Sequence, residues 1–323
     1  MEPLVSPGPL EPTAPSPGSA GRAIVDADVA AVLAGIGARA TGAVRITGLP
    51  SSRSDHAAFR VTLDDGRVVK TRRLSRAGKA RRFVGLARGL ASAQLAPILA
   101  HEGRICVEAW VDGVPLSALP PCAERLRAAA DLLGALHATR RLQGRRVARR
   151  GAPARVLQRA ERQLGRLAAA AVLTPARAAE LARVLRSATP ARAPIGLIHG
   201  DFCAENLVED ARGRLVAVDN ESLRLDFLDF DLARTWARWP MPDPDWDAFL
   251  ARYARWRGEP VDAAAAPFWR AAAIVKSLHL RTARRTALRD APLRRLDELL
   301  AGLGAGAQPL ARSRPRSSST RSR

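Results

Sequence analysis

The feature of this sequence that most constrains its fold is a single change in hydrophobic periodicity near Gly113. Before that point, from residue 43 to residue 111, β-branched and other apolar residues form short runs. The run at 59–63 alternates apolar with polar residues and stops at an Asp-Asp-Gly sequence, residues 64–66, which is typical of a β-hairpin. Between residues 76 and 95, apolar residues recur at helical spacing. The first part of the chain is therefore expected to form a small antiparallel sheet with one helix packed against it.

Beyond Gly113 the apolar residues mainly follow helical spacing. Such stripes cover residues 126–136, 246–256 and 268–280, and acidic residues precede the second stripe, as is common where a helix begins. Short β-like runs between residues 196 and 218 interrupt this pattern, and polar residues concentrate there. A small sheet-rich lobe followed by a larger, mostly helical lobe predicts a bilobal α+β fold.

The charge of the chain is strongly positive and is carried almost entirely by arginine. The 323 residues include 52 Lys+Arg against 31 Asp+Glu, a formal net charge of +21, and only Lys70, Lys79 and Lys276 are lysines. Ten arginines fall between residues 140 and 166, and five fall between residues 312 and 323. Neither cluster contains interleaved aromatic residues, on which the bases of a single strand would stack. We therefore interpret the arginines as solvated surface and expect no nucleic-acid partner.

Composition also argues against a membrane protein and against a disulfide framework. No run of about 18 apolar residues exists, so no membrane partner is expected. The three cysteines, Cys106, Cys122 and Cys203, have no CxxC spacing and cannot all pair. This pattern favours reduced thiols and a cytoplasmic location. The oligomeric state is not indicated by the sequence.

The concentrated polar chemistry lies in residues 199–221, which read HGDFCAENLVEDARGRLVAVDNE. His199, Asp201 and Asn206 have the H-x-D-x-x-x-x-N spacing of kinase catalytic loops. Phosphoryl transfer needs a carboxylate that orients the attacking hydroxyl and accepts its proton, together with amide and carboxylate oxygens that hold Mg²⁺. Asp219 closes the next apolar run, and a hairpin of two short strands would bring it to the same sheet end as Asn206. The segment therefore predicts such a site.

This segment closely resembles the aminoglycoside phosphotransferase and choline/fructosamine kinase superfamily, whose members share the protein-kinase-like fold. The resemblance implies that Asp201 is the catalytic base, that Asn206 is a metal ligand and that Asp219 is the principal Mg²⁺ ligand. The sequence departs from the family pattern at Asn220, where Trp or Phe is usual, so aromatic packing beneath Asp219 is not expected. The resemblance also implies supporting roles for three nearby residues: His199, Glu221 and Asp231.

Further residues of the first lobe are assigned to the nucleotide. Lys70 ends the third β-like run, where a kinase fold needs a cation that reaches the α- and β-phosphates. The Glu that usually steadies this lysine from the following helix is missing, because residues 76–94 contain no acid. The predicted phosphate-covering loop and the predicted adenine-binding hinge supply two candidates each: Ser52, Ser54, Glu108 and Trp110. A plain polar turn and a buried edge strand are the alternative interpretations of these two segments.

These assignments divide the chain into four parts. Residues 21–112 would form the N-lobe, which binds the nucleotide. Residues 113–303 would form the C-lobe, which carries catalysis and substrate binding. The ends, residues 1–20 and the basic tail 304–323, are poor in large apolar residues and are expected to be disordered.

The activity expected from the sequence is transfer of the γ-phosphoryl group of Mg-ATP to a hydroxyl or amine of a small molecule. Two alternatives remain open: a catalytically silent ATP-binding module of the same fold, suggested by the missing helix acid near Lys70, and an Arg-rich nucleic-acid-binding protein. The acceptor is not identified. Residues 209–262 contain twelve acids and eight arginines, which would favour an acidic cleft and a cationic acceptor.

Overall fold

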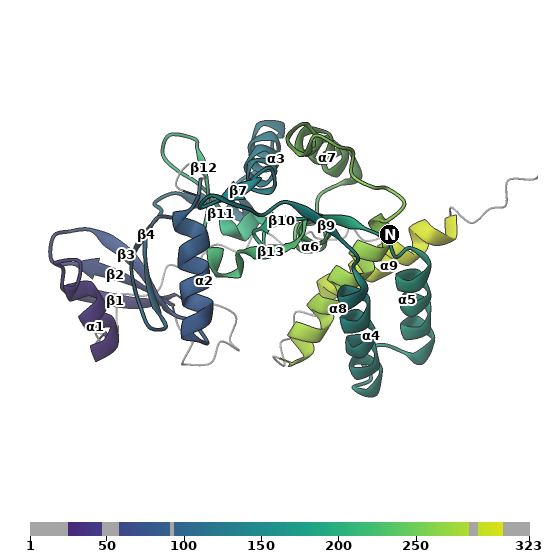
Figure 1. The fold of residues 1–323 in the computed structure, drawn as a ribbon, viewed down its shortest axis with the longest axis horizontal. Coiled ribbons are helices and arrows are strands. Elements are labelled where there is room, and N and C mark those ends of the chain that lie inside the picture. The colour runs from purple at the N-terminus through teal and green to yellow at the C-terminus, as the bar shows by residue number, and fades with distance from the viewer. Residues whose placement is uncertain (1–24, 47–57, 91–93, 284–289, 306–323) are drawn as a thin grey trace, which may run out of the picture.

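The computed structural model describes residues 25–46, 58–90, 94–283 and 290–305, and the chain folds into two lobes (Figure 1). The N-terminal lobe is built on a five-stranded sheet in the order β1-β2-β3-β5-β4, in which every neighbouring pair is antiparallel. Two helices flank the sheet. The elements of this lobe are α1 (Ala27–Ala34), β1 (Ala40–Ile46), β2 (Ala58–Leu63), β3 (Val68–Arg73), α2 (Ala77–Arg88), β4 (Ile98–Glu102) and β5 (Ile105–Ala109).

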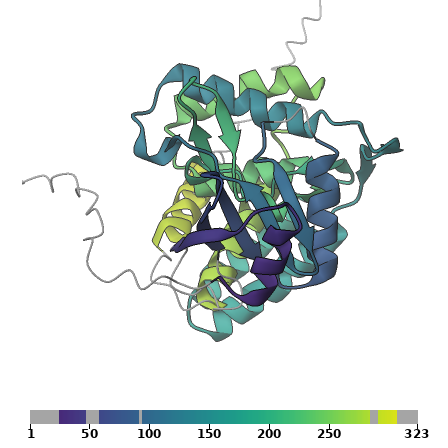
Figure 2. The same cartoon turned by 90° about the vertical axis from the view of Figure 1, so that its left-hand side faces the viewer.

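Side chains alternate between the two faces of this sheet and meet a different helix on each face. On one face Val69 and Val107 belong to the same small core as Leu33 of α1. On the other face Cys106 shares a core with Phe83 of α2, and that core continues into the second lobe. The face that carries α2 is therefore the one that adjoins the C-terminal lobe. Figure 2 views the molecule from the side of the N-terminal lobe.

The turn between β2 and β3 forms the hairpin that the sequence predicts. The backbone N–H of Leu63 donates to the carbonyl of Arg67 over 2.9 Å, and the Asp65 side chain accepts the N–H of Arg67 over 2.9 Å. Gly66 has a φ of +82°, a conformation that glycine adopts without steric cost. By contrast, α1 and β4 have no counterpart among the predicted elements. The pairing of β4 with β5 is irregular just after Ile98, and an irregular short strand gives little alternation to detect.

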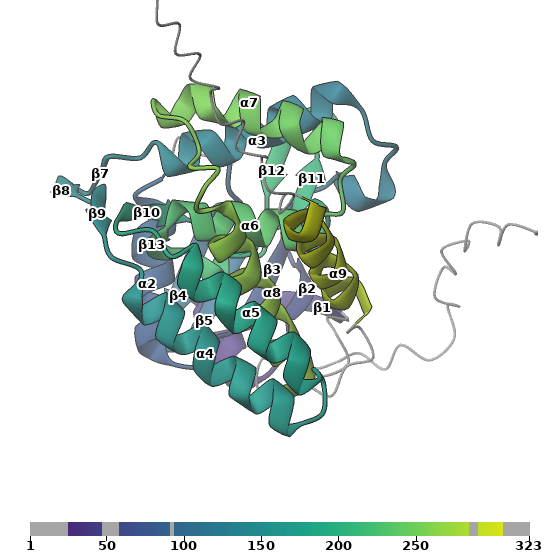
Figure 3. The ribbon, with the colours of Figure 1, turned by 90° about the vertical axis from the view of Figure 1, so that its right-hand side faces the viewer.

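The C-terminal lobe is mainly helical, in agreement with the apolar stripes of the sequence. Helix α3 packs against α7, while α8 contacts α4, α5, α6 and α9 (Figure 3). Phe268, Trp269 and Leu278 of α8 are almost completely buried, so α8 forms the centre of this helical group. The helices are α3 (Ala123–His137), α4 (Ala154–Ala169), α5 (Pro175–Ser187), α6 (Leu228–Arg238), α7 (Asp243–Arg257), α8 (Ala266–Ala283) and α9 (Asp290–Ala305).

Short strands form three further small sheets. In the first, β10 (Ala193–Ile198) lies between β9 (Arg149–Gly151) and β13 (Arg224–Phe227). In the second, β11 (Leu207–Glu209) lies between β6 (Val114–Pro115) and β12 (Leu215–Ala217). The third pairs β7 (Arg141–Leu142) with β8 (Arg145–Arg146). The described residues of the lobe also form three single 3-10 turns: η2 (Leu116–Ala118), η3 (Ala204–Asn206) and η4 (Asn220–Ser222).

The two lobes are joined at the β11–β12 hairpin. The N–H of Ala217 donates to the carbonyl of Gln94 over 2.7 Å, and the N–H of Ala96 donates to the carbonyl of Ala217 over 3.1 Å. These contacts fix the N-terminal sheet against the part of the C-terminal lobe that carries the candidate catalytic residues. The predicted bilobal α+β fold is thereby confirmed.

Some of the predicted features fall at the edge of the described chain. The predicted disordered segment 1–20 lies outside the described residues, as does the basic tail beyond Ala305, where α9 ends. Within the part that is described, no helix is both long enough and apolar enough to cross a membrane. All three cysteines are free.

Candidate active site

The predicted catalytic loop follows β10 directly and is shaped by Gly200. This residue has a φ of +80°, and a Cβ atom added to it would lie 2.8 Å from the carbonyl oxygen of Ser222. Any other residue would therefore meet both backbone strain and a steric clash. The resulting turn places Asp201 at the start of the loop, and η3 carries the chain on to Asn206.

Asp231, in the first turn of α6, holds this loop by its backbone. Its carboxylate accepts the N–H groups of His199 and Gly200, each over 2.9 Å, and lies 3.2 Å from Nε2 of His137. Nδ1 of His137 lies 2.8 Å from the hydroxyl of Tyr253. Burial raises the pKa of Asp231, but the hydrogen bond and the charge of His137 outweigh burial and lower this pKa to about 2. An ionised, buried carboxylate thus fixes the loop.

The β11–β12 hairpin brings Asn206 and Asp219 together. The two strands pair in antiparallel register, and the N–H of Val218 donates to the carbonyl of Asn206 over 2.9 Å. Nδ2 of Asn206 in turn donates to the backbone carbonyl of Asp201 over 2.9 Å. Three of the predicted site residues, Asp201, Asn206 and Asp219, therefore meet in one place at the end of the hairpin.

The oxygen atoms of this group fit a divalent cation such as Mg²⁺, which prefers carboxylate and amide oxygens. Since Nδ2 of Asn206 is used by Asp201, the amide oxygen of Asn206 is left available. Asp219 is 43% exposed and has a φ of +57°, a left-handed conformation that is rare outside glycine and is often found at functional sites. Within the described ranges no group of three or more His, Cys, Asp or Glu residues could hold a metal, so water and phosphate oxygens would complete the coordination.

Two cations of β3 reach Asp219 from the other lobe. Lys70 forms an ion pair with Asp219, and Arg72 approaches the same Oδ1 atom to 2.5 Å. Lys70 and Arg72 extend from the same face of β3 because side chains alternate along a strand. Burial raises the pKa of the Asp219 carboxyl, but the positive charges of Arg72 and Lys70 outweigh burial and hold this pKa well below its usual range. The carboxylate of Asp219 is therefore ionised and neutralised across the lobe boundary.

Arg72 was not among the predicted site residues, although it connects three acids. Its side chain is 7% exposed and pairs with Glu108, whose side chain is fully buried, over 2.8 Å. Arg72 also pairs with Glu221. Burial raises the pKa of Glu108, while Arg72 and Lys70 oppose this rise. As one arginine among many, Arg72 has no sequence signal except its spacing of two from Lys70, which puts both on one strand face.

Asp201 is held by two arginines that the sequence analysis also missed. Arg234 and Arg238 of α6 donate to its Oδ1 atom over 2.7 Å and 2.6 Å, and no described donor reaches Oδ2. Burial raises the pKa of Asp201, but the charges of Arg238 and Arg234 lower it below its ordinary value. The two arginines follow Asp231 by three and seven residues, which places all three on one helix face. That spacing is the signal that could have identified them.

The departure from the family pattern at Asn220 has a structural explanation. Asn220 is fully buried, and its Oδ1 atom lies 3.1 Å from Nε2 of His199. Its Nδ2 atom donates to the carbonyl of Ala217 over 3.0 Å. The asparagine therefore links the catalytic loop to the segment that carries Asp219 by hydrogen bonds, where an aromatic residue would do so by packing.

The predicted nucleotide-binding residues are only partly described. Glu108 is in β5, opposite Lys70 in the β3–β5 pairing. Trp110 follows β5, and its N–H donates to the carbonyl of Val68 over 3.3 Å. The role of these backbone positions in binding adenine stays a prediction. The two serines of the predicted phosphate-covering loop lie outside the described residues: Ser52 and Ser54.

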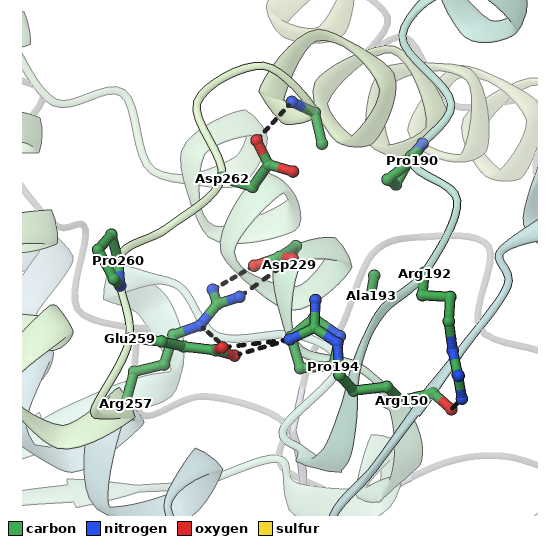
Figure 4. A pocket seen from close by; sticks show the side chains of 11 residues that line it. Arg150, Pro190, Arg192, Ala193, Pro194, Asp229, Arg257, Glu259, Pro260 and Asp262 are labelled. Atoms are coloured by element: carbon green, nitrogen blue, oxygen red, sulfur yellow. Dashed lines mark hydrogen bonds and ion pairs between the residues drawn. The ribbon is translucent and has the colours of Figure 1, made fainter.

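A cavity of about 50 Å³ lies elsewhere in the C-terminal lobe, beside the end of α7 (Figure 4). Charged pairs line it: Arg257 with Asp229, and Arg150 with Glu259 over 3.1 Å. None of the predicted catalytic or metal-binding residues lines this cavity, and it is far smaller than a typical ligand pocket of roughly 300–1,000 Å³. It is therefore separate from the candidate active site.

Solved structures with a similar fold are phosphotransferases and kinases. A macrolide 2'-phosphotransferase type I has a TM-score of 0.60 and 16% identity, covering 84% of this chain and 95% of that chain. A choline kinase from Streptococcus pneumoniae has a TM-score of 0.59 and 13% identity, covering 82% of this chain and 94% of that chain. An aminoglycoside-3'-phosphotransferase of type VIII has a TM-score of 0.51 and 19% identity, covering 71% of this chain and 92% of that chain. The similarity supports the protein-kinase-like fold.

The sequence itself matches a known family over most of its length. Among curated individual proteins there is no match. Residues 45–273 match the profile described as the phosphotransferase enzyme family, a span that includes Lys70 and the whole 199–221 segment. The resemblance drawn from that segment is confirmed. This chain belongs to the phosphotransferase enzyme family.

Proposed function

We propose that this protein transfers the γ-phosphoryl group of Mg-ATP to a hydroxyl or amine of a small molecule. Membership of the phosphotransferase family supports a small-molecule kinase. The observation that carries the proposal is the convergence of Asp201, Asn206 and Asp219. Asn206 donates to the carbonyl of Asp201 and accepts the N–H of Val218, each over 2.9 Å, and Lys70 of the other lobe pairs with Asp219. Two carboxylates, an amide and a lysine are the groups that phosphoryl transfer requires.

In this proposal Lys70 contacts the phosphates of the nucleotide, and Asn206 and Asp219 hold Mg²⁺ against them. When bound, the metal supplies positive charge that stabilises the transferring phosphoryl group. The ion pair between Lys70 and Asp219 already places these two side chains side by side. The fold therefore orients these two side chains before the substrate binds.

Asp201 orients the acceptor hydroxyl and takes its proton. Because Arg234 and Arg238 occupy Oδ1, the Oδ2 atom is left for the acceptor. The lowered pKa keeps this carboxylate ionised near neutral pH but makes it a weak base, which suits a reaction with a loose transition state. The acceptor oxygen bonds to the γ-phosphorus, the bond from that phosphorus to ADP breaks, and the proton passes to Asp201.

The test is the substitution Asp201→Asn, assayed by ADP release over a panel of small metabolites. Loss of the proton acceptor is expected to lower turnover by about 10²–10⁴-fold while the thermal unfolding midpoint stays near that of the wild type. The matched control is Asp297→Asn on α9, because Asp297 is 55% exposed and far in sequence from the site. This control is expected to keep full turnover.

Two results would contradict the proposal. Equal turnover by the wild type and Asp201→Asn would remove Asp201 from the mechanism. Binding of Mg-ATP without phosphorylation of any acceptor would instead favour the catalytically silent ATP-binding module. The absence of an acid on α2 is the observation that suggests this alternative.

We further propose that the enzyme works in the cytoplasm on a small-molecule acceptor, without a nucleic-acid or membrane partner. The free state of all three cysteines supports a reducing compartment. Some arginines of the 140–166 cluster have protein partners, such as Arg150 with Glu259 over 3.1 Å. Arg150 therefore takes part in the contacts of the second lobe.

A further inference from the structure

The chemical class of the acceptor follows from the charges around Asp201. The acceptor hydroxyl must lie within hydrogen-bond reach of Asp201, so the rest of a small acceptor lies within a few ångströms of it. Arg234 and Arg238 of α6 touch Asp201 directly, and Arg281 of α8 is electrostatically coupled to Arg238 and Asp201. The acid that faces this group from the catalytic loop is Glu205, 3.5 Å from Arg238.

Lys276 of α8 adds a further positive charge, on which Arg234 acts electrostatically. Its Nζ atom lies 5.0 Å from the centre of the Phe230 ring, and no carboxylate of the described chain lies within ion-pair distance of it. The charged groups that act on it from the surrounding elements are mostly cationic: Arg234 of α6, Arg224 and Asp226 of β13, and Arg159 of α4. Lys276 is thus a partly buried cation without an anion of its own.

Arg234 is also incompletely satisfied. It is 6% exposed, and only its Nη2 atom has a partner, which is Asp201. Its Nε and Nη1 atoms are buried and have no hydrogen-bond partner among the described residues. Unpaired donors on a buried guanidinium are costly, and an acceptor atom from a ligand beside them would strengthen the positive site.

Many of the acids in residues 209–262 are neutralised by a neighbouring cation. Asp226 pairs with Arg224 over 2.9 Å, and Asp229 pairs with Arg257. Other acids of this segment are held in the same way: Glu209 by Arg125, Asp210 by Arg214, Glu221 by Arg72 and Asp231 by His137. The acids named here are therefore paired and offer little free negative charge to a cationic acceptor, whereas Asp243 and Asp247 of α7 are exposed.

We propose that the acceptor carries an oxyanion, either a carboxylate or a phosphate ester, which Arg238 and Lys276 bind beside Asp201. The inference rests on the proposed function and names the substrate class of the same site. Arg238 is the accessible member, with 26% of its side chain exposed. Arg238 would give up its hydrogen bond to Oδ1 of Asp201 in order to bind the oxyanion. The exchange would hold the acceptor and would remove one donor from the carboxylate that receives the proton.

The first test compares acceptors that share a hydroxyl skeleton and differ in charge. Glycerol, glycerate, glycerol 3-phosphate and serinol form one set; glucose, glucuronate, glucose 6-phosphate and glucosamine form another. Binding is measured by calorimetry with Mg²⁺ and a non-hydrolysable ATP analogue present. A charge-assisted contact predicts that an anionic member binds about tenfold or more tightly than its neutral counterpart, and that added salt weakens it. Comparing the carboxylate acceptors with the phosphate-ester acceptors shows which of the two oxyanions the site binds.

The second test uses two of the three lysines of the chain. Lys276→Gln is expected to weaken anionic acceptors by about tenfold and to leave neutral acceptors unchanged, whereas Lys276→Arg retains the charge and the affinity. Lys79→Gln on α2 is the matched control, because it removes the same charge from the other lobe. Thermal unfolding of each variant separates loss of binding from loss of fold.

The pH dependence of binding tests the same contact between Lys276 and the oxyanion. Burial, followed by the charges of Arg234 and Arg224, lowers the pKa of Lys276 to about 7, while Asp226 opposes this. The ammonium is therefore charged below about pH 7 and neutral above it. Affinity for an anionic acceptor is expected to fall between pH 6 and pH 8.5 in the wild type and to stay level in Lys276→Arg, since arginine remains charged.

The outcomes distinguish this inference from the proposed function. If neutral or amine acceptors bind as tightly as anionic ones, or if no anionic member binds, the oxyanion site is overturned even where Asp201-dependent turnover stands. If anionic acceptors bind in a Lys276-dependent manner but no acceptor is phosphorylated, the proposed reaction fails and the anion site stands.

Discussion

At the scale of single residues, Arg72 connects acids of the N-terminal sheet with acids of the C-terminal lobe. Glu108 lies opposite Lys70 in the β3–β5 pairing, and Arg72 pairs with Glu108 over 2.8 Å. Because Arg72 also reaches Asp219 and Glu221, it ties the N-terminal sheet to the predicted metal ligand of the other lobe. Helix α2 lacks the expected acid, and the ion-pair partner of Lys70 in the structure is Asp219.

The substitution Arg72→Met is expected to lower the free energy of unfolding by about 3–5 kcal/mol, because it leaves Glu108 buried without a partner. Urea denaturation measures this loss. The control Arg67→Met removes an exposed arginine of the β2–β3 turn and is expected to cost about 1 kcal/mol or less. In the double variant Arg72→Met/Glu108→Leu, much of the stability should return, since no buried charge remains. A single variant no less stable than the control would refute this role.

The sequence specifies some of these residues and leaves others without a signal. His199, Asp201 and Asn206 have a fixed spacing within one loop, so they can be recognised from a single segment. Arg72 pairs with Glu108, Asp219 and Glu221, which lie far from it in the chain, and its spacing of two from Lys70 does not report these contacts. In addition, a functional arginine cannot be told from its neighbours in a chain with 52 Lys+Arg.

At the scale of elements, α6 organises the candidate site from a single face. Asp231 in its first turn holds the catalytic loop, and Arg234 and Arg238 in the following turns hold Asp201. The spacing of three and seven residues places the three side chains in one row. One helix therefore fixes both the backbone of the loop and the carboxylate that the loop presents.

The contribution of Asp231 to stability is expected to depend on pH. Its folded-state pKa of about 2 is below its ordinary value of 3.8, so its stabilising effect is present above about pH 4 and is lost as the pH falls towards 2. Asp231→Asn should therefore be less stable than the wild type at pH 7, by about 2 kcal/mol, and this difference should shrink at pH 3. Urea denaturation at both pH values measures it, with Asp297→Asn as the exposed control. A difference that does not change with pH would contradict the assignment.

Elements with clear periodicity are predicted well, and those shaped by their neighbours are not. The strands β2 and β5 and the helices α3, α7 and α8 coincide with apolar patterns in the sequence. Helix α1 is rich in alanine, and β4 is short and pairs irregularly, so neither has a distinctive pattern. Strand β13 forms because β10 offers it an edge, a condition that arises only after the chain has folded.

At the scale of the whole molecule, the site lies between the lobes and each lobe contributes charge to it. Lys70 and Arg72 come from the N-terminal sheet, and Asp219 and Glu221 come from the C-terminal lobe. Backbone hydrogen bonds between Ala217 and residues 94 and 96 hold the lobes in this arrangement. A ligand that contacts both lobes is therefore expected to stabilise the entire chain.

Mg-ATP at about 100 times its dissociation constant is expected to raise the free energy of unfolding by about 2.7 kcal/mol, because it binds only the folded state. A thermal shift assay with Mg²⁺ alone, ATP with a chelator, and both together measures this effect. The rise should be largest with both and should be smaller in Asp219→Asn, which lacks one of the proposed metal-binding oxygens. An equal shift in the variant would exclude Asp219 as a ligand.

The shared core also determines how the polypeptide can be divided. Phe83 of α2 packs in a core that continues into the C-terminal lobe, and Arg72 finds Glu221 there. A gene split after residue 112 would yield two polypeptides, each exposing the apolar and charged surface that its counterpart normally covers. Each fragment is expected to aggregate when it is produced alone. Co-expression should allow the two fragments to assemble without a covalent link.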